Sequence, residues 1–165
     1  MSPRRFDLTA AADAERALAA IAGGKPVPGE ILTRLKGLPA LLRASGVPAV
    51  LAFFGAKAGP ATSAPISAQA SGSDPGAQQL ASAYRKVRHA LVEQLTVELG
   101  WAQPPTDIYG QLAALPAADL ARAYRRLEAY AGWLRRLAEA TEQAQTEQAQ
   151  TEQPTAPAPT GPTGG

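Results

Sequence analysis

The sequence predicts an all-α protein, a compact bundle of about five to six helices with a long internal loop and a disordered C-terminal tail. Aromatic residues make up only 5% of the 165 residues, so a core must consist mostly of Leu, Val, Ile and Ala. Leu and Ala are among the best helix formers. The runs of Val, Ile, Thr and Tyr that are typical of strands are missing. Apolar residues recur instead at helical spacing, most clearly over residues 79–99 and 116–140.

Three helices are expected in the first part of the chain, at about residues 9–21, 30–36 and 39–57. Thr9 is the expected N-cap of the first helix. Gly37 is expected to interrupt the second, and Gly46 and Pro48 should kink or break the third. The second half of the third helix is apolar nearly all round, which predicts a central place in the core.

The second part of the chain alternates between helical and irregular segments. Residues 59–79 contain three prolines and a single charge, and predict a flexible loop that serves either to bind or, as we favour, as a spacer. Helices are expected over residues 79–99 and 116–140, with a short segment near 111–115 between them. Residues 1–140 therefore form one helical domain.

Residues 141–165 are predicted to be a disordered tail. A Thr-Glu-Gln-Ala-Gln unit occurs twice, and a Pro/Thr/Gly segment follows. Glu and Gln tolerate a helix, so the preceding helix could continue for some way. However, the segment has no large apolar residue that could pack in a core.

The composition argues against catalysis. Without cysteine there can be no disulfide, thiolate nucleophile or cysteine-ligated zinc. The single histidine, His89, lies between Arg88 and Ala90, close to Arg85 and Lys86, and is a poor general base or metal ligand. We therefore expect it to be a solvated surface residue. Phosphate-binding glycine loops, zinc motifs and paired carboxylates are missing. We expect no enzyme activity, no metal and no cofactor.

The sequence also predicts a cytoplasmic protein that does not associate with a membrane. Basic residues near the N-terminus are not followed by the apolar region of a signal peptide. The longest apolar run, residues 47–56, is too short to cross a bilayer.

The charge of the chain is distributed unevenly. All 16 Lys and Arg residues precede residue 137, and three of the 14 acids follow residue 140. Residues 1–140 thus hold 16 cations against 11 acids, a net charge of +5. A basic body with an acidic tail suggests a polyanionic partner, although an ordinary soluble protein can have the same balance.

Two groups of basic residues are candidates for binding that partner. On the predicted helix 79–99, cations gather in about one turn, opposite the apolar stripe. These are Arg85, Lys86, Arg88 and His89.

The other group lies on the predicted helix 116–140. At 100° per residue, Arg122 and Arg126 fall within about 20° of Trp133, and Arg136 lies on the same side. Arginine beside an exposed aromatic ring suits phosphate contact and stacking on bases. In the alternative interpretation, Trp133 packs against a neighbouring helix and the arginines lie around it.

Two segments together resemble a known family. Residues 38–57 read LPALLRASGVPAVLAFFGAK, and residues 124–140 read YRRLEAYAGWLRRLAEA. The first resembles a Leu-Pro, glycine, Leu-Ala-Phe-aromatic pattern that closes with Lys57. The second is similar to a C-terminal Trp-Leu-basic-Arg-x-Ala-Glu-Ala helix. Both patterns belong to the small helical subunit of the type III-B (Cmr) CRISPR RNA-guided effector complex, although Pro48 departs from the family pattern.

The resemblance implies a non-catalytic role in antiviral defence. Members of this family stack along the complex beside the backbone subunits, near the large polymerase-like subunit, and help to hold target RNA against the guide RNA. For this chain it implies contacts with guide and target RNA, with the other Cmr subunits and with copies of itself. Lys57 and the basic residues of the two helices become candidates for phosphate contact. The small subunit of the type III-A complex has a similar role but lacks this pair of motifs. The alternative is a helical protein-binding adaptor with no nucleic-acid contact.

Overall fold

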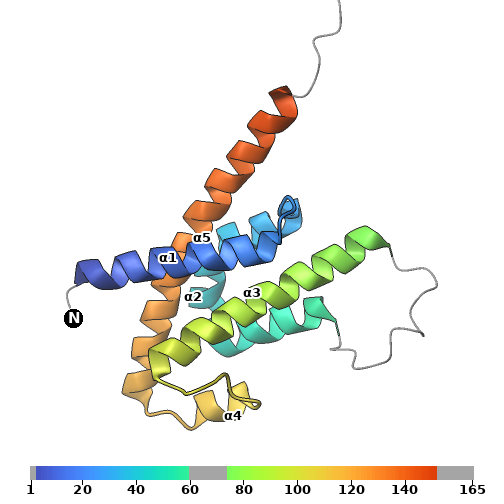
Figure 1. The fold of residues 1–165 in the computed structure, drawn as a ribbon. Helices are drawn as coiled ribbons and strands as arrows, with labels where there is room; N and C mark the ends of the chain where they lie inside the picture. Colours follow the sequence, from blue (N-terminus) through green and yellow to red (C-terminus); the bar gives the residue numbers. More distant parts are fainter. Residues whose placement is uncertain (1–2, 60–73, 152–165) are drawn as a thin grey trace, which may run out of the picture.

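The computed structural model describes residues 3–59 and 74–151, with side chains from residue 8 onward, and its secondary structure is entirely helical. This confirms the predicted all-α bundle. The helices cross one another around a shared core, and the end of the last one projects beyond the others (Figure 1). They are α1 (Pro3–Ala22), α2 (Gly29–Ala58), α3 (Pro75–Leu99), α4 (Ile108–Ala113) and α5 (Ala117–Thr151).

The first helix starts earlier than predicted. α1 begins at Pro3, so Thr9 lies inside it and is not its N-cap. Proline suits the first helical position because its missing N–H would be unsatisfied there in any case. Ala14 and Ile21 are buried on the inner face. The helix ends at Ala22, close to the predicted residue 21, and Gly23 follows it with a φ of 58°.

Gly37 does not interrupt α2, so the prediction of two separate helices at residues 30–36 and 39–57 was wrong. A single glycine costs a helix only about 1 kcal/mol, and the burial of Leu35 and Leu38 on either side exceeds that cost. The predicted break at Gly46 is confirmed, with φ 75° and ψ 167° inside the helix. Pro48 follows it and restarts the helical path.

The second and third helices provide much of the core. α2 packs against α3 and α5, and α1 packs mainly against α5. The Phe54 and Tyr84 rings lie 5.8 Å apart, and the Tyr84 hydroxyl donates to Glu30 Oε1 at 2.5 Å. α2 is long and apolar enough to span a bilayer by length and composition, but residues along it such as Leu51 and Phe54 are fully buried in this core.

The loop predicted over residues 59–79 ends earlier than expected, because its last residues belong to α3. α3 begins at Pro75, and Asp74 caps it by accepting a hydrogen bond from the Gly76 N–H at 3.0 Å. Residues 60–73 lie outside the described residues, so the flexible loop stays a prediction. α3 ends at Gly100, whose φ of 68° is the left-handed conformation that glycine adopts without strain.

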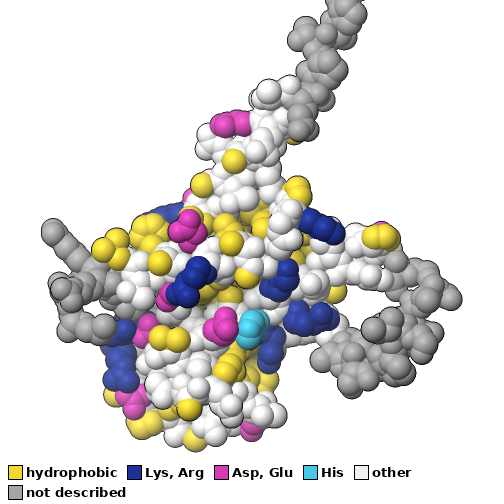
Figure 2. Space-filling view, viewed as in Figure 1, with side chains coloured by type: hydrophobic (Ala, Val, Ile, Leu, Met, Phe, Trp, Pro, Cys, Tyr) yellow, Lys and Arg dark blue, Asp and Glu magenta, His cyan; other side chains and the backbone are white. Residues whose placement is uncertain are grey.

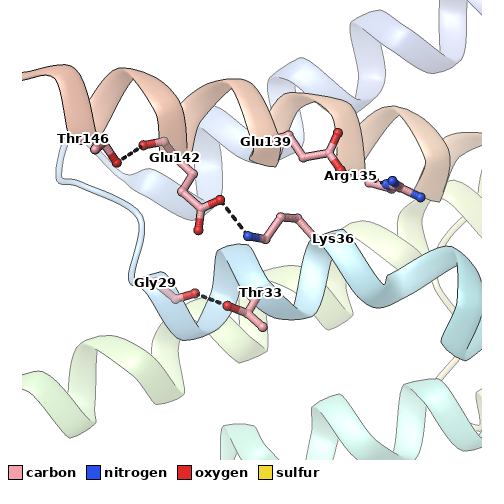
Figure 3. A network of polar contacts seen from close by, with 7 residues as sticks. All are labelled: Gly29, Thr33, Lys36, Arg135, Glu139, Glu142 and Thr146. Atoms are coloured by element: carbon pink, nitrogen blue, oxygen red, sulfur yellow. Dashed lines mark hydrogen bonds and ion pairs between the residues drawn. The ribbon is translucent and has the colours of Figure 1, made fainter.

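Residues 141–151, predicted to belong to a disordered tail, continue α5 as helix. Glu, Gln and Ala favour a helix, and residues 141–153 contain no Pro or Gly. The Lys36 Nζ lies 2.6 Å from Glu142 Oε2, and the Thr146 hydroxyl donates to the Glu142 carbonyl (Figure 3). Residues 152–165 lie outside the described residues, and their disorder stays a prediction.

Candidate nucleic-acid interface

The basic residues of α3 lie over the C-terminal ends of the two preceding helices. The Arg85 guanidinium donates to the Ala58 carbonyl at 3.3 Å, and Lys86 Nζ donates to the Ile21 carbonyl at 3.3 Å. Carbonyls at a helix C-terminus have no partner within their own helix and carry partial negative charge. The two cations are thus held in place by the helix ends, with further donors left to contact a ligand.

We group two more of the predicted cations with these two. Arg88 lies beside α2, where a Cβ placed on Gly55 would be 3.4 Å from Arg88 Nε, so the glycine leaves room for the guanidinium. Lys57 is exposed in the last turn of the same helix. Among the residues that the structure describes, no ion pair joins Lys57, Arg85, Lys86 or Arg88 to a carboxylate. We call these four residues the α3 cluster. Lys and Arg side chains gather over α3 in Figure 2.

A groove runs beside the α3 cluster. It has a volume of about 440 Å³ and lies between α3 and the segment that precedes α4. One wall is cationic and the other is apolar, with Pro104, Pro105 and Ile108. His89 stands on the cationic wall with Nε2 3.3 Å from Glu93 Oε1, and its side chain is 64% exposed, in keeping with the predicted surface position. A cationic wall facing an apolar one suits phosphate on one side and a ribose or base on the other.

The arginines predicted to form a second binding face on α5 are partly engaged by acids of the protein itself. Arg126 Nη1 lies 2.9 Å from Glu98 Oε2, and the Glu98 side chain is only 7% exposed. This ion pair joins α5 to the end of α3, so Arg126 has a structural role. Arg122 pairs with Asp119 on its own helix at 3.0 Å, where both side chains are exposed.

Trp133 takes the position expected in the packing interpretation. Its side chain is half-buried and packs against the hydrophobic core. The Arg136 guanidinium lies over the ring, 4.8 Å from its centroid, at a distance typical of a cation–π interaction. Of the four α5 candidates, the structure therefore brings Arg136 and Trp133 into direct contact, whereas Arg122 and Arg126 each contact a carboxylate.

The structure also has a larger groove that was not predicted from the sequence. It lies between α2 and α5, has a volume of about 610 Å³ and contains four arginines: Arg43, Arg125, Arg135 and Arg136. One of these comes from α2, and a helical plot of α5 alone cannot include it. Three residues of α5 that line the groove, Arg125, Gly132 and Arg136, are spaced by seven and four, which is the signal that could have revealed it.

A family model described as CRISPR-associated protein (Cas_Cmr5) matches residues 9–141. The chain belongs to this Cmr5 family. It is therefore a small subunit of a type III-B (Cmr) CRISPR complex, as the two sequence segments suggested. No curated protein and no solved structure matches the chain significantly.

The Cmr5 match extends from α1 into α5 and ends one residue before Glu142. The projecting end of α5 thus lies beyond the part of the chain that the family model covers. In the described part of this Cmr5-family chain, no three His, Asp or Glu side chains gather as they would around a metal ion.

Proposed function

We propose that this Cmr5-family chain stacks along the effector complex as a non-catalytic subunit and holds target RNA against the guide RNA in the cytoplasm. The α3 cluster is the observation that carries this proposal. Its four cations come from two helices and form no ion pair with a carboxylate among the described residues. The three on α3 line a groove with an apolar wall. The partners would be the two RNAs, the backbone and large polymerase-like subunits, and copies of the chain.

The α3 cluster suits RNA better than the cations of α5 do. A phosphate approaching Arg126 or Arg122 would have to compete with Glu98 or Asp119. At the α3 cluster, Arg85 and Lys86 contact neutral carbonyls and no carboxylate within the described part of the chain, so their positive charges are not cancelled there. Contacts of this kind attract a phosphate backbone without reading its sequence. Guide pairing would then supply the specificity.

The proposal can be tested in the assembled complex with the double variant Lys57→Gln and Arg88→Gln. We expect target-RNA capture to fall several-fold at low salt, and the loss to shrink as salt rises. For a single strand, losing two phosphate contacts lowers the log–log salt slope by about 1.4. The matched control is Arg16→Gln with Arg122→Gln, which removes the same charge from two exposed arginines that pair within their own helices.

Equal capture by the two double variants would contradict the RNA role of the α3 cluster. That outcome would favour the alternative, a protein-binding adaptor. A second arm measures binding of generic single-stranded RNA by the isolated chain, which we expect to be weak, salt-sensitive and independent of sequence. An adaptor would bind such RNA in neither assay.

A further inference from the structure

The groove between α2 and α5 is not used by the proposed RNA contact. Apart from its charged residues it is lined by Pro39, Ala129 and Gly132, and we call these three residues its floor. A Cβ added to Gly132 would meet no atom within 4 Å, so this part of α5 leaves open space above its backbone. A helix could therefore approach closely here.

The charges in this groove alternate. Arg43 Nε lies 2.7 Å from Glu128 Oε1, and Arg135 Nε lies 2.9 Å from Glu139 Oε1, the second pair being drawn in Figure 3. Arg125 has no ion pair among the described residues. Arg136 has none either, and Trp133 supports its guanidinium. Two uncompensated cations thus stand eleven residues apart on α5, about 16 Å along the helix.

The same helix carries the opposite charge at its other end. Residues 117–136 hold five Arg against two acids, a net charge of +3. Residues 137–151 hold three Glu and no cation, a net charge of −3. Two of these glutamates are already paired, Glu139 with Arg135 and Glu142 with Lys36. The turns beyond Glu142 project past the other helices (Figure 1). Glu147 faces no cation among the described residues and accepts a hydrogen bond from Gln143 at 3.0 Å.

We propose that the α2–α5 groove receives the projecting acidic end of α5 from a second copy of this chain. Glu147 of one copy would lie near Arg125 or Arg136 of the next, and the amides of the Gln residues could reach Glu128 and Glu139. The charge of Glu147 complements those of Arg125 and Arg136, and the open space at Gly132 gives a helix room to approach. The inference names a contact for the proposed stacking of copies and rests on that proposed function.

RNA fits this groove less well than a peptide helix does. A phosphate backbone carries one negative charge per nucleotide and would pass close to Glu128 and Glu139, which stand among the arginines. Residues 143–151 hold one Glu among four Gln. A helix end of this composition carries an isolated charge and can place neutral amides beside those carboxylates.

The test is sedimentation of the isolated full chain, without RNA, over a range of concentrations at low and high salt. We expect weak, salt-sensitive self-association. The groove variant, Arg125→Glu with Arg136→Glu, and the end variant, Glu147→Arg, should each weaken association by roughly fivefold or more. Mixing the two variants should restore association between unlike copies, because the reversed charges again complement one another. Arg122→Glu, which lies outside the groove, should associate like the unmodified chain.

Arg136→Glu also removes the guanidinium that lies over the Trp133 ring, and this loss could disturb the fold. A second groove variant that keeps Arg136 provides a control for that effect. Gly132→Leu adds a side chain to the floor without changing charge, and its Cβ would meet no atom within 4 Å. It should also weaken association while its circular dichroism stays helical. A monomer at every concentration, or variants that associate like the unmodified chain, would overturn the inference. Loss of RNA binding by the groove variant with unchanged association would identify an RNA site instead.

This experiment separates the inference from the proposed RNA contact. The α3 double variant, Lys57→Gln with Arg88→Gln, should associate normally even if it captures target RNA poorly. Conversely, the groove variant can fail to associate whether or not the α3 cluster binds RNA.

Discussion

Lys36 of α2 and Glu142 of α5 form an ion pair with Nζ 2.6 Å from Oε2, and they tie the beginning of one helix to the far end of another (Figure 3). Both side chains are partly exposed, at 31% and 45%. Exposed pairs of this kind contribute about 0–1 kcal/mol. The pair therefore adds little to the stability of the fold.

Truncation after Ala140 should accordingly lower the melting temperature by only a few degrees, since it removes this ion pair and no apolar core residue. Truncation after Thr151 should leave it unchanged, because the pair is kept. Thermal melts of both forms, with Lys36→Gln as a control that loses the same pair in the full chain, provide the measurement. A drop of more than about 10 °C after the first truncation would mean that residues 141–151 contribute to the core.

Two glycines of α2 should respond to alanine in opposite directions. Gly37 lies within the helix and a Cβ there would meet no atom within 4 Å, so Gly37→Ala should stabilise by about 0.5–1 kcal/mol. Gly46 has a φ of 75°, which an alanine adopts only with strain, so Gly46→Ala should destabilise by about 1–2 kcal/mol. Urea unfolding of both variants tests this pair, and a gain in stability at Gly46 would show that the kink is not required.

Removing the guanidinium of Arg126 should destabilise the fold, whereas removing that of Arg122 should not. Arg126→Ala leaves the Glu98 carboxylate, 7% exposed, without its cation, at a cost of about 1–3 kcal/mol. Arg122→Ala breaks only an exposed pair within one helix and should stay within about 0.5 kcal/mol. Adding Glu98→Gln to Arg126→Ala should recover part of the loss. Equal stability of the two single variants would argue against a structural role for Arg126.

Trp133→Ala should cost about 1.5–3 kcal/mol, less than the 3–5 kcal/mol typical of a fully buried ring, because Trp133 is only half-buried. Arg136→Ala removes the guanidinium above the ring and should cost about 1 kcal/mol or less. Thermal and chemical unfolding of the two variants provide the comparison. A Trp133→Ala variant as stable as the unmodified chain would revive the stacking interpretation of this residue.

Three tyrosines should make the fold sensitive to alkaline pH. Burial raises the pKa of Tyr84, Tyr124 and Tyr130, with the nearby carboxylate of Glu30 adding to the pKa shift of Tyr84. The stabilisation is complete below the ordinary tyrosine pKa of 10.0. Above it the unfolded chain releases its phenolic protons while the folded chain keeps them, so stability falls as pH rises toward the raised pKa values.

This dependence can be measured as the free energy of unfolding between about pH 8 and pH 11. Tyr84→Phe should flatten the decline, because it removes one of the protons that only the folded state retains. A decline as steep in Tyr84→Phe as in the unmodified chain would show that the Tyr84 hydroxyl does not contribute.

The sequence by itself determined the features that depend on residues close together in the chain. The stripe that includes Tyr84, Val87 and Leu91 recurs at helical spacing, and these residues are buried as predicted. Gly46 breaks α2 with a positive φ, a conformation that glycine adopts readily and other residues rarely do. The segments at residues 38–57 and 124–140 were likewise sufficient to suggest the family.

Only the tertiary structure decided which charges remain uncompensated. Arg126 and Arg122 have similar settings in the sequence, but helix packing places Glu98, 28 residues away, against the first of them. The same packing brings Arg43 of α2 beside Glu128 of α5 and so forms the second groove. Periodicity records which face of a helix is apolar, because that depends on neighbours three and four residues apart. The partner of a surface cation depends on how two helices cross, and no local pattern encodes that crossing.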